Sequence, residues 1–150
     1  FHMPSKRKIT LIVSVVGLLV VSWLCYSIFF SRTNTTIVET VSGLELVGSY
    51  DIQVIEDSWA DPTSTSSDGK TFLKVNLTEE QCSALVNQAR QLNYQNFPII
   101  LTGTTELPNE ITNINDGMYR INIGVPDNRD VKVSAIDVGN KKLYVFFNYM

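Results

Sequence analysis

The longest uncharged segment of the chain constrains its architecture more than any other feature. Ile9 to Phe30 runs for 22 residues without a charged side chain and is apolar on every helical face. As an α-helix it would extend about 33 Å, close to the roughly 30 Å hydrocarbon core of a bilayer. Aromatic rings, which favour the headgroup level, gather at its C-terminal end: Trp23, Tyr26, Phe29 and Phe30. The sequence therefore predicts a transmembrane anchor over 9–30.

The charges predict how this anchor is oriented. Residues 1–32 carry four basic residues and no acid, which gives +4, and three of them (6–8) precede the apolar segment. Residues 33–150 carry the other eight basic residues and all fifteen acidic ones, which gives −7 and restores the overall −3. The positive-inside bias places a tail over 1–8 in the cytoplasm and the rest of the chain outside it. Phe1 and His2 precede the first methionine and are interpreted as additions to the natural chain.

A cleaved signal peptide is the alternative interpretation, because it also places a basic stretch before an apolar one. The segment is longer than a typical signal core and lacks a clean pair of small residues at its end. The bulky Leu24 before Cys25 does not fit a lipoprotein signal. We therefore expect an uncleaved, single-pass anchor in the inner (cytoplasmic) membrane of a bacterium, with a periplasmic or extracellular C-terminal domain.

The remaining chain is predicted to be a short stalk followed by one α+β domain. Residues 31–43 are rich in Ser and Thr without an apolar stripe, which is typical of a linker. The domain, 44–150, combines one amphipathic helix over 79–92, opened by a capping box from Thr78 to Gln81, with several alternating segments. The predicted strands lie within 44–59, 72–77, 99–101, 118–124, 131–138 and 143–149. We expect a small antiparallel sheet packed on one helix, after a single N-terminal transmembrane helix.

The last predicted strand, Leu143 to Tyr149, is apolar on both faces. Such a strand lies in the middle of a sheet, or at an edge that a partner completes. The second possibility would allow a homodimer through the C-terminal strand.

The sequence offers no recognisable set of catalytic groups. The only histidine is His2, so a nucleophile after the anchor lacks the usual base. Cys82 lies in the first turn of the predicted helix, where the dipole would lower its pKa, but it shares the apolar stripe and is interpreted as a core residue. Ser67 and Lys70 match a serine–lysine pattern without the helix that this chemistry requires. We predict no enzyme activity, no cofactor and no metal site.

The acidic domain disfavours nucleic acid and favours a basic protein partner. The candidate contact lies in the polar segment around 57–70, predicted to be a mobile surface loop, with Trp59 as its apolar anchor. The acidic residues around it are Glu56, Asp57, Asp61 and Asp68. A solvated loop with one tryptophan fixed in the core is the alternative interpretation.

These features lead to two functional hypotheses. The first is a membrane-anchored immunity protein or inhibitor that occludes the active cleft of a toxin or wall hydrolase. In general architecture the chain is similar to anchored bacteriocin-immunity proteins, although no motif assigns it to a family. The second is a non-catalytic subunit of an envelope or secretion assembly.

Overall fold

The computed structural model describes residues 6–30, 33–58, 69–101, 106–123 and 131–149. The chain divides into two compact units, Phe1–Thr33 and Asn34–Met150, which are described separately below.

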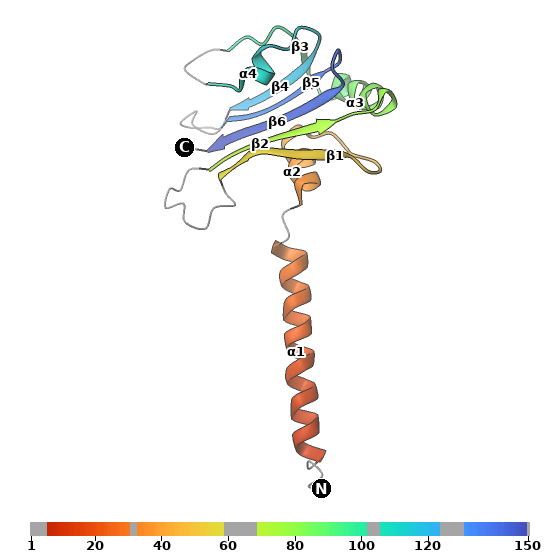
Figure 1. Cartoon of the computed structure of the whole chain (residues 1–150), viewed down its shortest axis with the longest axis vertical. Coiled ribbons are helices and arrows are strands. Elements are labelled where there is room, and N and C mark those ends of the chain that lie inside the picture. Colours follow the sequence, from red (N-terminus) through yellow and green to blue (C-terminus); the bar gives the residue numbers. More distant parts are fainter. Residues whose placement is uncertain (1–5, 31–32, 59–68, 102–105, 124–130, 150) are drawn as a thin grey trace. The chain divides into compact units, whose positions relative to one another are not determined.

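In the first unit the structure describes one helix, α1 (Lys6–Phe30), drawn in red to orange in Figure 1. The helical part of the prediction over 9–30 is confirmed. Large apolar side chains of α1 are exposed, among them Val13, Leu18 and Trp23. Over the residues that the structure describes, however, no helix has the length and apolarity needed to cross a bilayer. The structure therefore does not support the membrane-spanning part of the prediction, which remains a proposal.

The second unit has the predicted α+β architecture. Over the described residues its sheet is antiparallel, has six strands and follows the order β1-β2-β6-β5-β4-β3 (Figure 1). The strands are β1 (Asp51–Asp57), β2 (Gly69–Asn76), β3 (Gln95–Asn96), β4 (Gly117–Ile123), β5 (Val131–Asp137) and β6 (Lys142–Tyr149). The helices of this unit, within the described residues, are α2 (Asn34–Ser42), α3 (Glu79–Gln91) and the short α4 (Asn109–Thr112).

Each face of the sheet contributes to its own apolar core, because successive strand residues point to opposite sides. The first core joins α2 and α3 to one face and includes Val38, Leu85 and Leu73. The second core joins the segment around α4 to the other face and includes Ile111 and Phe72. The sheet is therefore covered on both sides over its central strands.

The segment predicted as a stalk is mostly helical. Residues 34–42 form α2, and Ile37, Val38 and Val41 are buried in the first core. The Ser42 hydroxyl donates to the Val38 carbonyl at 2.6 Å and accepts from the Leu44 N–H at 3.0 Å. Burial of three apolar side chains outweighs the weak helix propensity of this Thr- and Val-rich sequence. Residues 34–42 thus pack as part of the second unit.

The predicted amphipathic helix is confirmed as α3. The Gln81 N–H donates to the Thr78 hydroxyl, and the Thr78 N–H donates to the Gln81 side chain at 2.9 Å, which completes the capping box. Cys82, Leu85 and Ala89 are buried along one stripe. Local capping and periodicity therefore define this helix.

The structure decides two predictions about strands. β6 is hydrogen-bonded to β2 on one side and to β5 on the other, so it is an interior strand and its edge is not available for a homodimer. The strand predicted over 99–101 is wrong, because the structure has no strand there and Ile100 is 77% exposed. Its neighbour Ile99 packs on the second core, and the short strand of this region is β3.

Candidate protein-binding site

The structure places two of the five predicted contact residues. Glu56 and Asp57 end strand β1, at the edge of the sheet. Trp59, Asp61 and Asp68, together with nearly all of the predicted loop, lie outside the described residues.

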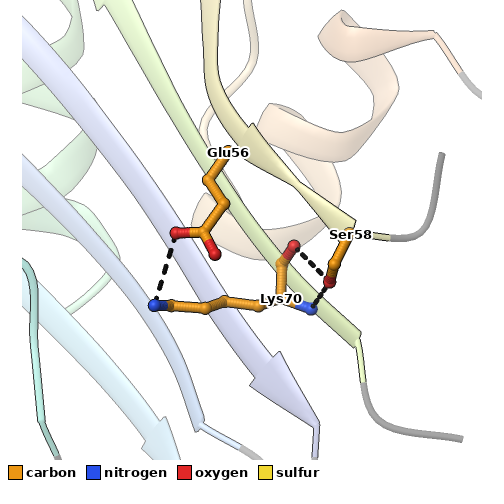
Figure 2. Close-up of polar contacts among 3 residues, drawn as sticks. All are labelled: Glu56, Ser58 and Lys70. Atoms are coloured by element: carbon orange, nitrogen blue, oxygen red, sulfur yellow. Dashed lines mark hydrogen bonds and ion pairs between the residues drawn. The ribbon is translucent and has the colours of Figure 1, made fainter. Parts of the chain in front are cut away.

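A set of hydrogen bonds joins the end of β1 to the start of β2. The Lys70 N–H donates to the Ser58 hydroxyl oxygen at 2.7 Å, and that hydroxyl donates to the Lys70 carbonyl at 3.1 Å (Figure 2). The Thr71 hydroxyl donates to the Asp57 carboxylate at 3.0 Å. These bonds hold the residues on the two sides of segment 59–68 together: Ser58 with Lys70, and Asp57 with Thr71.

An ion pair spans the same two strands. The Lys70 Nζ lies 3.3 Å from the Glu56 carboxylate, and Figure 2 shows the two side chains reaching toward one another. Both side chains are nearly half exposed (43% for Lys70, 48% for Glu56), so water screens the pair and it contributes at most about 1 kcal/mol. The Lys70 Nζ also lies 5.8 Å from the centroid of the Phe146 ring, within cation–π range. Glu56 can therefore exchange its partner at little cost.

Beside this pair lies an open hollow of about 270 Å³, here called the acidic hollow. Its lining combines three glutamates, one lysine and four apolar residues: Ile55, Glu56, Lys70, Phe72, Glu106, Leu107, Pro108 and Glu110. Three carboxylates against one ammonium group give the lining a formal charge of −2. Such a lining favours a cationic side chain with an apolar stem.

Of the eight residues that line this hollow, Glu56 alone is among the five contact residues predicted from the sequence. Glu106 and Glu110 lie about 50 residues from Glu56 in the chain and reach the hollow because the segment leading into α4 packs on the second face of the sheet. α4 has only four residues, and the residue before it, Pro108, makes no side-chain cap. No periodic or capping signal in the sequence therefore points to this segment.

Groups with clearly shifted pKa values lie elsewhere in the fold. Burial raises the pKa of the Cys82 thiol, with the nearby Glu79 carboxylate as the next cause, so the thiolate is disfavoured. The direction is opposite to the lowering expected from the helix dipole and agrees with Cys82 as a core residue. Burial also raises the pKa of Tyr94, to about 12, although its hydrogen bonds with Ser134 and Ser42 act in the opposite direction. Within the described ranges, no group of three His, Cys, Asp or Glu side chains could hold a metal ion.

A comparison with known proteins gives no assignment: no protein-family model, no curated protein and no solved structure matches this chain.

Proposed function

We propose that the chain is a membrane-anchored, non-catalytic protein-binding domain whose acidic hollow receives a basic side chain of its partner. The observation that carries the proposal is the hollow itself, with three glutamates around one half-exposed lysine. The most specific form of the proposal is an immunity protein or inhibitor that covers the active cleft of a toxin or wall hydrolase.

The lining explains why an arginine or lysine would be preferred. The guanidinium or ammonium group would be surrounded by Glu56, Glu106 and Glu110, and the Lys70 ammonium would move away from Glu56. The methylene stem would cover the apolar wall formed by Leu107 and Pro108. The domain's net charge of −7 over 33–150 would steer a basic partner toward this surface and raise its association rate.

The N-terminal segment completes the proposal. We propose that residues 9–30 anchor the domain in a bacterial inner membrane, with the N-terminus in the cytoplasm, on the strength of the 22-residue uncharged run and its basic flank. Confinement at the bilayer would raise the effective concentration of the domain where an incoming toxin arrives.

Site-specific photo-cross-linking of the full chain tests the proposal. A photoreactive residue replaces Glu106 in the acidic hollow, and the matched control replaces Asn87, an exposed residue of α3 on the first face of the sheet. We expect one basic protein to be cross-linked from position 106 and not from position 87, with a yield that falls at high salt. Equal adducts at both positions, or none at position 106, would contradict the proposal.

A second candidate function is a subunit of an envelope assembly, favoured by the edge of β1, which pairs with no second strand among the described residues. The two candidates differ in what α1 does. An inhibitor keeps its protective effect when 33–150 is joined to an unrelated transmembrane helix, whereas an assembly subunit that packs through its own helix loses function.

A further inference from the structure

The terminal strand β1 presents an open backbone edge. In the part of the chain that the structure describes, β1 pairs with β2 on one side and with no strand on the other. Its middle residues Val54 and Ile55 are 49% and 45% exposed. An edge strand directs alternate N–H and C=O groups outward, and these groups can pair with an added strand.

This edge is held rigidly enough to serve as a template. β1 pairs with β2 from Asp51 to Asp57, with one bulge between Val54 and Glu56. At its first residue the Asn76 amide donates to the Asp51 carboxylate at 2.6 Å, and at its far end the Ser58 bonds fix it to Lys70. Because β1 is already ordered, binding of an added strand would lose little free energy to the ordering of β1.

The charges on β1 indicate what kind of strand fits. Both ends are acidic, with Asp51 at one and Glu56 and Asp57 at the other, and the strand carries no basic residue. A second copy of β1, paired antiparallel about Val54, would place Asp51 opposite Asp57 twice, which like-charge repulsion disfavours. A strand with basic ends and an apolar centre is complementary in either direction.

From these observations we infer that the partner adds an extended segment, basic at both ends and apolar in the middle, to the open edge of β1. The inference rests on the proposed function and supplies its binding mode. Backbone pairing along 51–57 would bring the end of the segment near Glu56 to the rim of the acidic hollow, since Ile55 and Glu56 belong to both surfaces.

A designed peptide tests the inference on the full chain in detergent micelles. The probe is a nine-residue peptide with two basic residues at each end and alternating threonine and valine between them. Two further versions carry N-methyl groups on alternate residues, one on the valines and one on the threonines. In strand addition only one of these two sets of N–H groups faces β1.

We expect the unmodified peptide to bind. One methylated version should bind at least about tenfold more weakly, and the other should stay within about threefold. Binding should also protect backbone amides of 51–57 from hydrogen exchange. The double variant Asp51→Asn with Glu56→Gln should weaken binding by about threefold or more, while Glu80→Gln, an exposed acid of α3, should not.

Failure of the inference is distinguishable from failure of the proposed function. An absence of peptide binding, equal effects of the two methylated versions, or no protection of 51–57 would overturn strand addition. The cross-link from position 106 would then decide the proposed function separately. If the peptide experiment excludes strand addition but a salt-sensitive cross-link still forms from position 106, the acidic hollow would be the sole proposed contact.

Discussion

Removal of one buried hydroxyl, by Tyr94→Phe, probes the packing that holds α2 to the sheet. Tyr94 is 6% exposed. Its hydroxyl donates to the Ser42 carbonyl at 2.8 Å and accepts from the Ser134 hydroxyl at 2.5 Å. These two bonds connect the end of α2 and strand β5 through Tyr94, which lies three residues beyond the end of α3.

The magnitude at neutral pH follows from the groups left behind. The Ser134 hydroxyl and the Ser42 carbonyl are both buried and would each lose a partner, so we expect the free energy of unfolding to fall by about 1–3 kcal/mol. For a unit of about 117 residues, 1 kcal/mol corresponds to roughly 4 °C in Tm. The variant should therefore melt about 4–12 °C below the unmodified chain.

The pH dependence supplies a second, independent signature. Burial raises the Tyr94 pKa from 10.0 to about 12, so above pH 10 the unfolded chain releases this proton while the folded chain retains it. The stability contributed by the neutral phenol is complete below pH 10 and is lost as the pH rises toward 12. A difference of two pKa units corresponds to roughly 2–3 kcal/mol in the free energy of unfolding. The phenylalanine variant has no phenol at this position and cannot lose this contribution at high pH.

Urea unfolding of the full chain in mild detergent, followed by circular dichroism at pH 8 and pH 11.5, measures both effects. The stability difference between the unmodified chain and Tyr94→Phe should shrink at the higher pH. Tyr119→Phe is the matched control at pH 8, because its hydroxyl bonds only part-buried groups such as the Gln95 side chain. A constant difference between the two pH values, or an equal loss in the control, would refute the reasoning.

Three further predictions concern the helices. Thr78→Ala removes one half of the capping box and should lower the free energy of unfolding by about 1 kcal/mol, measured by urea unfolding; an unchanged midpoint would contradict the role of the cap. Val38→Ala in α2 should lower the free energy of unfolding by about 2 kcal/mol, because this side chain is fully buried. The control Thr40→Ala, at an exposed position of α2, should change it by no more than about 0.5 kcal/mol. Equal effects of the two substitutions would argue that α2 does not pack in the core. Deletion of 9–30 should move the protein from the membrane pellet to the supernatant after alkaline extraction, and retention in the pellet would contradict the proposed anchor.

Much of the second unit follows from local signals in the sequence. The capping box at Thr78 and the stripe through Cys82 and Leu85 define α3, since both depend on residues within one or two helical turns. The apolar character of β6 on both faces predicts either an interior strand or an edge that a partner completes, and the structure has the interior strand, covered by two cores. These predictions hold because neighbouring residues alone specify them.

The errors arise where packing at a distance decides the local structure. The α2 segment has few strong helix formers, and its helix exists because Ile37, Val38 and Val41 are buried against a sheet formed much later in the chain. The apolar run from Ile99 to Leu101 is too short for its pattern to distinguish a strand from a loop. Of its three residues, Ile99 packs against the second core and Ile100 is exposed.

The candidate site was predictable only in part for the same reason. The sequence predicts Glu56 and Asp57 as contact residues because they are acidic and lie at the start of the polar segment 57–70. Glu106 and Glu110 become part of the acidic hollow through the packing of the α4 segment on the second face, which no local pattern records. Sequence reasoning found the acidic character of the surface but not its shape.

The most direct test of the central claim is the salt dependence of affinity for the protein cross-linked from position 106. Its Kd for the full chain is measured between about 50 and 500 mM salt, alongside the triple variant Glu56→Gln, Glu106→Gln and Glu110→Gln. If the acidic hollow binds a basic partner, the unmodified chain binds more weakly as salt rises, and the triple variant binds weakly throughout with a much flatter dependence. Equal affinity and equal salt dependence for the two chains would contradict the claim.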